Sequence, residues 1–247
     1  MPSAPWTASR SRASSPCRRD DGRARGARIL PSAVAEPFAH LRAADPVLAR
    51  ILDEHGAPSV GRDPSRPGPA DHYGALVRSI VGQQLSVIAA RSIYRRLLEH
   101  FGGRTPTPAE VLAADPDAMR VAAGLSRAKV QFLRSLAEHV VSGELELERL
   151  DALPDEEIVA ELVAVRGIGE WSAHMFLMFQ LERPDVLAVG DLGIRRAVER
   201  AYGLPGLPSP AELTALAEPW RPWRTAACRV LWRSLDNVPV QAADATP

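Results

Sequence analysis

The sequence predicts an all-α protein of about ten helices in a compact, two-lobed fold. Apolar residues recur every three to four positions along most of the chain, which is the period of a helix buried on one face. Helix capping signals fall at the ends of these periodic stretches. No Asn-Gly or Asp-Gly turn joins two stretches of alternating apolar residues, so a sheet-based domain is not expected.

The helical period runs through eight stretches, at about 36–55, 71–82, 86–101, 126–142, 155–165, 170–181, 191–202 and 221–235. Thr107 and Ser209 each precede a proline and are followed three residues later by a glutamate. An N-cap, a proline in the first turn and a capping-box glutamate together predict two further helix starts. Gly124 and Gly143 follow periodic stretches and are expected to end helices.

The segments that flank the helical region differ from it in composition. Residues 1–30 contain seven arginines and two aspartates among many Ser, Ala, Pro and Gly residues. We expect residues 1–33 to form a disordered tail, with a transit peptide as the second interpretation. Residues 57–70 are rich in Pro and Gly, and residues 237–247 are expected to be a flexible C-terminal tail. The helical domain is therefore expected over 34–236.

Composition excludes several classes of protein. No apolar stretch approaches the roughly 18–20 residues that a membrane span needs. Cys17 and Cys228 are the only cysteines, which excludes a disulfide scaffold, a four-cysteine zinc site and an iron–sulfur cluster, and fits a reducing cytoplasm. Thirty basic residues balance thirty acidic ones, and Lys129 is the only lysine. Any lysine nucleophile would have to be that residue.

The most informative segment is the glycine turn within residues 162–173. One helix is expected to end near Val165 and the next to begin directly after Gly167-Ile168-Gly169. The two glycines allow positive φ and close approach of a partner. Main-chain amides of Gly167, Ile168, Gly169 and Glu170, at the positive end of the new helix, could bind a DNA phosphate without reading sequence. The alternative is a plain tight turn between two helices.

Asp191 is the candidate catalytic carboxylate. It follows a short apolar segment and stands at the start of a helix. The simplest interpretation is an N-cap, a position that Asp favours. A carboxylate held at a helix start beside a phosphate-binding turn could also stabilise positive charge on a sugar, or direct a water molecule towards it.

Several blocks of the chain resemble the helix-hairpin-helix DNA glycosylases, and specifically the 3-methyladenine DNA glycosylase II type. The resemblance covers roughly residues 70–236 and is carried by the order of these blocks: Leu76–Ser86, Gly124–Lys129, Val165–Ala173, Gly190–Gly193, and Trp220–Ala227 with Trp232. It implies an enzyme that flips an alkylated purine, such as 3-methyladenine or 7-methylguanine, out of double-stranded DNA and hydrolyses its N-glycosidic bond, with Asp191 as the catalytic carboxylate.

The resemblance also assigns roles to individual side chains. Gln84, with Gln83 beside it, matches the wedge that fills the gap left by the flipped nucleotide, although both could belong to a solvated loop. Trp171, Met175 and Trp232 match positions that line the base pocket. The family often has an aromatic residue where this chain has Met175. An ordinary core position is the alternative for Trp171.

Tyr73 could approach the base pocket or simply pack in the core. In the family, main-chain carbonyls that match Val163, Val165 and Ile168 hold a monovalent cation, Na⁺ or K⁺. No cofactor is required for the expected reaction, and no iron–sulfur cluster is expected. We expect a monomer that binds no membrane and is associated with the nucleoid in the cytoplasm of a bacterium.

Trp171 also bears on the mechanism. In the family members that cut DNA, a lysine stands two residues after the second glycine of the hairpin and forms a Schiff base with the sugar. Here that residue is Trp171, and Lys129 belongs to a different block. Without an amine nucleophile at this position, the enzyme is expected to be monofunctional and to stop at an abasic site.

Two other functions remain open at the level of sequence. One is a helix-hairpin-helix protein that binds DNA without catalysis, which would need neither Asp191 nor the two tryptophans. The other is a glycosylase for deaminated or oxidised bases, which would differ in the shape of its pocket.

Overall fold

The protein is described by a computed structural model covering residues 31–59, 61, 69 and 71–236, and the side chains from residue 36. Within these residues the structure has twelve α-helices, two 3₁₀ helices and no strand, so the predicted all-α fold is confirmed. The α-helices are α1 (Pro31–Ala44), α2 (Pro46–His55), α3 (His72–Gly82), α4 (Val87–His100), α5 (Pro108–Ala113), α6 (Pro116–Ala123), α7 (Arg127–Ser142), α8 (Asp155–Ala164), α9 (Glu170–Phe179), α10 (Leu192–Tyr202), α11 (Pro210–Leu216) and α12 (Arg224–Asp236). The 3₁₀ helices are η1 (Leu147–Ala152) and η2 (Glu218–Trp220).

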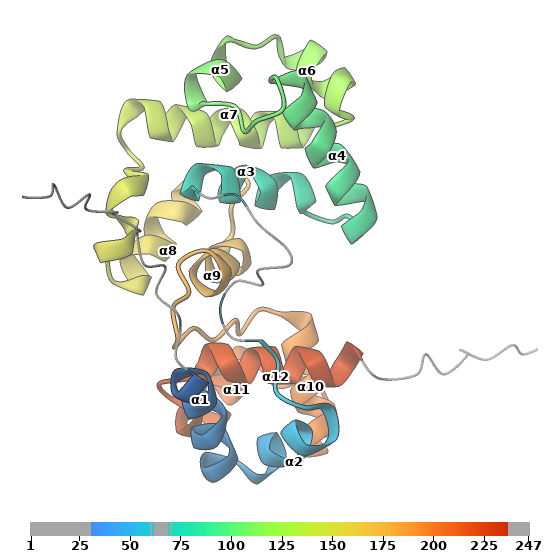
Figure 1. Ribbon diagram of the computed structural model, residues 1–247, viewed down its shortest axis with the longest axis vertical. Coiled ribbons are helices and arrows are strands. Elements are labelled where there is room, and N and C mark those ends of the chain that lie inside the picture. Colours follow the sequence, from blue (N-terminus) through green and yellow to red (C-terminus); the bar gives the residue numbers. More distant parts are fainter. Residues whose placement is uncertain (1–30, 60, 62–68, 70, 237–247) are drawn as a thin grey trace, which may run out of the picture.

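The helices form two groups, as Figure 1 shows. Helices α3 to α7 make one lobe, in which α3 packs on α4 and α7, and α5 packs on α7, while α8 packs on α9 beside this lobe. Helices α1 and α2 pack with α10, α11 and α12 into the second lobe, where α2 contacts α12 and α10 contacts α12. Helix α9 lies between the two groups. The start and the end of the described chain therefore build the same lobe.

The expected helix over 36–55 is two helices, and this prediction was wrong in one respect. The break lies between Ala44 and Pro46 because proline has no N–H and disfavours a helical conformation of the residue before it. Asp45 is extended, with φ −147° and ψ 111°, and its carboxylate accepts from the amides of Val47 and Leu48 at 2.8 and 3.2 Å. An aspartate before a proline thus starts α2 instead of continuing α1.

The other predicted helix signals are confirmed. Thr107 and Ser209 both form complete capping boxes, at the starts of α5 and α11. Gly124 and Gly143 end α6 and α7 in the left-handed conformation, with φ of 75° and 79°. Helix α1 begins slightly before the expected domain start at residue 34. Of the expected tail at 1–33, residues 31–33 belong to α1, and residues 1–30 lie outside the described residues, as do the expected tail at 237–247 and most of 57–70.

Asp45 also joins distant parts of the second lobe. Besides capping α2, it accepts a hydrogen bond from the Tyr202 hydroxyl at the end of α10. The indole N–H of Trp220, which is fully buried in η2, donates to the same carboxylate oxygen at 2.8 Å. Burial, and then the Asp45 carboxylate, raise the pKa of Tyr202 well above its usual value. Three elements therefore depend on one buried carboxylate.

We predict that Asp45→Ala lowers the free energy of unfolding by about 2–4 kcal/mol, since it removes a helix cap and leaves the buried Trp220 N–H and the partly buried Tyr202 hydroxyl without an acceptor. Denaturant unfolding measures this change. Asp53→Ala is the control, because the ion pair of Asp53 with Arg42 is exposed and is worth at most about 1 kcal/mol. Equal stability of the two variants would contradict the proposed role of Asp45.

Candidate active site

Asp191 caps helix α10 and is held close to its backbone. Its Oδ1 accepts from the amide of Ile194 at 2.8 Å, so the N-cap interpretation is correct. Asp191 as a residue is only 9% exposed. Burial of a carboxylate is costly unless donors surround it, and the cap supplies only one of them.

The segment before Asp191 is fastened to helix α12. The Thr225 hydroxyl donates to the carbonyl of Arg183 at 2.6 Å and accepts from the amide of Val186 at 3.1 Å. Arg224 forms an ion pair with Asp185, with 2.6 Å between Nε and Oδ1. Helix α12 therefore fixes the approach to Asp191.

Two indole groups complete the environment of Asp191. Trp171 Nε1 donates to Asp191 Oδ2 at 2.7 Å, and Trp232 Nε1 donates to Asp191 Oδ1 at 3.0 Å. Trp171 comes from α9 and Trp232 from α12. Trp171 is 47% exposed, which excludes the alternative that it is a core residue. Both carboxylate oxygens thus accept from N–H groups, and the carboxylate is fixed in orientation from three sides.

Gly193 is a residue of this site that the sequence interpretation missed. A Cβ atom there would lie 3.0 Å from Asp191 Oδ1 and 3.3 Å from Trp232 Nε1. These distances are shorter than ordinary van der Waals contacts. With glycine at position 193, the Trp232 indole and the carboxylate meet without having to shift away from a Cβ atom.

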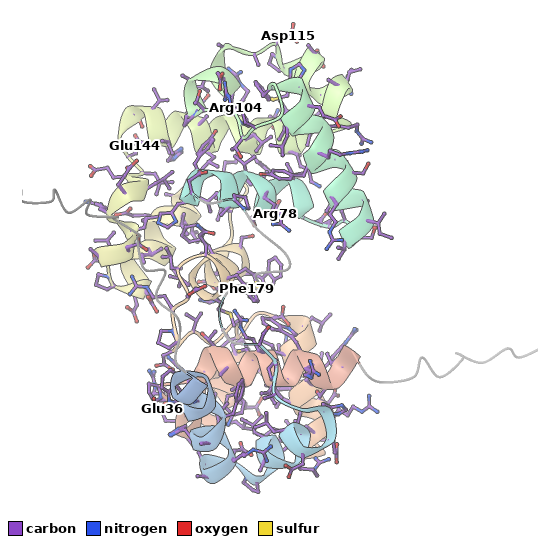
Figure 2. All side chains as sticks on the ribbon, viewed as in Figure 1. Glu36, Arg78, Arg104, Asp115, Glu144 and Phe179 are labelled. Atoms are coloured by element: carbon purple, nitrogen blue, oxygen red, sulfur yellow. The ribbon has the colours of Figure 1, made fainter. Side chains whose placement is uncertain are left out.

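Phe179 was also missed. It is 43% exposed, and Figure 2 shows it between α9 and the second lobe. Its ring stacks on Trp232 with 6.0 Å between centroids and 26° between planes, and the Arg229 guanidinium lies 4.8 Å from its centroid. Phe179 stands four residues after Met175 and eight after Trp171, so the face that Trp171 and Met175 define on α9 could have been extended to it.

The two other expected pocket residues, Met175 and Tyr73, lie in or against the core. Met175 is partly buried against the core. Tyr73 is buried, burial raises its pKa well above the usual value, and its hydroxyl has no hydrogen-bond partner among the described residues. Neither makes a hydrogen bond or ring contact with Asp191, Trp171 or Trp232 in the described part of the chain. Their role in a base pocket stays a prediction.

The glycine turn joins α8 to α9 as expected, but its two glycines do different things. Gly167 has φ of +94°, and a Cβ there would lie 2.2 Å from the ring of Phe132. Gly169 has φ of −102°, and a Cβ there would meet nothing within 4 Å. The expected positive φ is therefore confirmed for Gly167 and wrong for Gly169, whose open side faces away from the protein's own atoms.

The amides of the hairpin are also unequal. The amide of Ile168 donates to the carbonyl of Val165 at 3.0 Å, so it is used inside the turn. Gly169 begins α9 without a side-chain cap, and no acceptor for the amides of Gly169 and Glu170 lies among the residues that the structure describes. Amides at an uncapped helix start suit an anion.

The loop that carries Gln84 lies between α3 and α4. Ser86 caps α4 as predicted, since its hydroxyl accepts from the amide of Ala89 at 3.3 Å. Gln84 is exposed and has φ of +58°, which is unusual for a residue with a side chain. Gln83 turns towards the hairpin instead, where its Nε2 donates to the carbonyl of Gly167 at 2.8 Å. Gln84 is thus the glutamine available to an external partner.

Lys129 makes a structural contact. Its Nζ donates to the carbonyl of Val81, near the end of α3, at 2.8 Å, and burial lowers its pKa. That carbonyl belongs to the last turn of a helix, where intrahelical donors are missing.

No cluster of three or more His, Cys, Asp or Glu side chains suited to a metal ion occurs in the described part of the chain. None of the helices described is both long and apolar enough to cross a membrane.

Comparison with known proteins agrees with this geometry. Residues 77–222 match the model of the HhH-GPD superfamily base excision DNA repair proteins, and the chain belongs to this family. It is 36% identical over 164 residues to DNA-3-methyladenine glycosylase 1 of Schizosaccharomyces pombe, covering 66% of this chain and 72% of that protein.

Two solved structures of DNA glycosylases have a similar fold. The DNA-3-methyladenine glycosidase of Bacillus halodurans is similar with a TM-score of 0.71 and 33% identity, over 81% of this chain and 89% of that one. The 3-methyladenine DNA glycosylase of Schizosaccharomyces pombe, in complex with abasic DNA, is similar with a TM-score of 0.70 and 32% identity, over 80% of this chain and 95% of that one.

The unequal glycines yield a prediction about DNA binding. Gly169→Ala should leave the melting temperature nearly unchanged but weaken binding to damaged and undamaged DNA alike, because the new methyl group projects where a phosphate would dock. Gly167→Ala should instead lower stability by more than about 1 kcal/mol, since it forces positive φ on alanine and collides with Phe132. Calorimetry and fluorescence anisotropy distinguish the two effects. Unaltered DNA affinity in a folded Gly169→Ala variant would contradict phosphate binding by the hairpin and leave it only the role of a turn between two helices.

Proposed function

We propose that this protein is a DNA glycosylase that removes alkylated purines from double-stranded DNA by hydrolysis and leaves an abasic site. The observation that carries the proposal is the carboxylate of Asp191, held between the indole N–H groups of Trp171 and Trp232. A protein that only bound DNA would need no buried carboxylate fixed in this way. The names of the relatives, which are 3-methyladenine DNA glycosylases, support the same substrate class.

Binding begins at the DNA backbone. The amides at the start of α9 receive a phosphate, and Gln84 enters the base stack in place of the damaged nucleotide. The flipped base lies against the tryptophans, whose N–H edges point to Asp191 and whose faces attract a cationic purine by about 0.5–2 kcal/mol each. Phe179 covers part of Trp232 and limits which face of that indole is available.

In the hydrolysis step, positive charge moves from the alkylated base to the sugar. As the bond between C1′ and the purine nitrogen breaks, its electron pair moves to the base and neutralises the positive charge that alkylation had placed there. The sugar becomes oxocarbenium-like, and the carboxylate of Asp191 stabilises it. Water attacks C1′, and its proton passes to the solvent through Asp191. Because the leaving base is neutral, no general acid is needed.

The proposal needs no cofactor, since water and the carboxylate suffice. A monovalent cation, Na⁺ or K⁺, would fit the carbonyls of Val163, Val165 and Ile168. The carbonyl of Val163 lies in the last turn of α8, which ends at Ala164, and the carbonyl of Val165 accepts from the amide of Ile168 but has a second lone pair. Carbonyl oxygens are suitable ligands for such ions. Bound there, the ion would add positive charge near the phosphate.

One chain contains the hairpin, the wedge and the carboxylate, so we propose that it acts as a monomer on the DNA of a bacterial nucleoid. With Trp171 in the place of a catalytic lysine, the enzyme is proposed to be monofunctional.

We predict that the protein excises 3-methyladenine and 7-methylguanine from duplex oligonucleotides. The product strand should remain intact until alkali or heat is applied, and borohydride should trap no enzyme–DNA adduct, because no amine lies at the carboxylate. Gel analysis with hypoxanthine and 8-oxoguanine as further substrates measures the range of lesions. A trapped adduct that persists in Lys129→Ala would show that the chemistry has been misplaced, and excision of only the oxidised or deaminated base would replace the proposed substrate.

Asp191→Asn should reduce excision at least about 100-fold, because the charge that stabilises the sugar cation is lost. Affinity for abasic-site DNA should stay close to that of the wild type. Stability should fall by about 1–2 kcal/mol, since asparagine keeps the helix cap but its amide nitrogen cannot accept from the half-exposed Trp171 indole. Asp117→Asn, which removes an exposed carboxylate at the start of α6, is the control and should be fully active. Near-normal excision by Asp191→Asn would exclude Asp191 as the catalytic carboxylate.

A further inference from the structure

The loop that presents Gln84 is poorly held by its own backbone. Its internal hydrogen bonds are long, at 3.4 Å from the amide of Gln83 to the carbonyl of Ile80 and 3.3 Å from the amide of Leu85 to the carbonyl of Gly82. Gln84 also has the left-handed conformation, which is unfavourable for a residue with a Cβ. Something outside the loop must therefore stabilise its shape.

Two shorter bonds come from other elements. Gln83 Nε2 donates to the carbonyl of Gly167 in the hairpin at 2.8 Å, and Lys129 Nζ donates from α7 to the carbonyl of Val81 at 2.8 Å. The bond from Lys129 holds Val81, in the last turn of α3, and the bond to Gly167 holds Gln83, the first residue after that helix. The chain is thus fixed directly before and directly after the end of α3.

Helix α7 supports the hairpin as well. The ring of Phe132 occupies the space where a side chain at Gly167 would lie, and the Ser135 hydroxyl accepts from the amide of Arg166 at 3.3 Å. Lys129, Phe132 and Ser135 are spaced by three residues and so lie on one side of α7. Figure 1 shows α7 running alongside α3. One helix face therefore contacts both DNA-binding turns.

We propose that Gln83 is a positioning residue that joins the loop of Gln84 to the phosphate-binding hairpin. This proposal rests on the proposed function. Helix α7 connects the two turns indirectly, and the hydrogen bond from Gln83 to Gly167 connects them directly. A phosphate bound at the start of α9 therefore sets the depth at which Gln84 enters the duplex. Gln83 itself does not enter the DNA, since its amide faces the protein.

The effect of the Gln83–Gly167 hydrogen bond on the rate of excision should depend on how stably the damaged base is paired. Displacing a paired base requires unstacking and unpairing, whereas a mismatched base is already partly displaced. A loose wedge therefore impairs excision most when the lesion is well paired. A general loss of stability would impair excision equally in both contexts.

The test is a double-mutant cycle over Gln83 and Gln84, measured as kcat/KM for hypoxanthine or 7-methylguanine, whichever the wild type excises, paired in one duplex and mismatched in another. Gln83→Ala is expected to lose at least tenfold on the paired lesion and less than threefold on the mismatched one. Gln83→Glu, which keeps the length but removes the N–H donor, should behave in the same way. The variant with both glutamines replaced by Ala should be no worse than Gln84→Ala alone, because Gln83 acts through Gln84.

Binding provides a second readout that needs no catalysis. The wild type should bind duplexes with a tetrahydrofuran abasic analogue more tightly than undamaged DNA, and Gln83→Ala should lose most of that preference while it keeps its affinity for undamaged DNA. Multiplicative losses in the cycle, equal losses on paired and mismatched lesions, or full preference in a folded Gln83→Ala or Gln83→Glu variant would overturn the proposal. A wild type that excises nothing would overturn the proposed function, while the binding preference would still decide the role of Gln83.

Discussion

The carboxylate of Asp191, accepting hydrogen bonds from two indole groups, is the interaction on which the rest of the site depends. Its donors come from α9 and α12, and its own position comes from the start of α10. Helix α9 and the second lobe must therefore be correctly placed relative to each other for the carboxylate to be fixed. Glycine at position 193 also helps to keep the carboxylate in place, since a methyl group there would press on both Asp191 and Trp232.

This arrangement separates the two ends of each tryptophan by function. The N–H edge orients the carboxylate, and in the proposed mechanism the aromatic faces that Phe179 leaves open receive a cationic base. Fixing the carboxylate before the substrate arrives is what electrostatic stabilisation of a sugar cation requires, because no reorganisation is then needed during the reaction. We propose that the hairpin and the loop of Gln84 bind the DNA, and α7 contacts both of these turns.

Much of this could be predicted from the sequence because the relevant interactions are local. Capping boxes at Thr107 and Ser209, and left-handed glycines after α6 and α7, depend on residues three to five positions apart. The turn of the hairpin and the cap at Asp191 are local as well. The direction of a side chain between elements is not. Gln83 and Gly167 are 84 residues apart, and Trp232 is 41 residues from Asp191, so periodicity could not show that these groups meet.

The most direct test of the central claim is the affinity for two abasic-site analogues in the same duplex, a cationic pyrrolidine and a neutral tetrahydrofuran. The pyrrolidine imitates the charge of the reacting sugar, so tight binding reports stabilisation of that charge without any chemistry. A carboxylate fixed at the sugar predicts that the wild type prefers the cationic analogue by at least tenfold, and that Asp191→Asn loses this preference while it binds the neutral analogue normally. Equal affinity of the wild type for both analogues, or an undiminished preference in Asp191→Asn, would contradict the role assigned to Asp191.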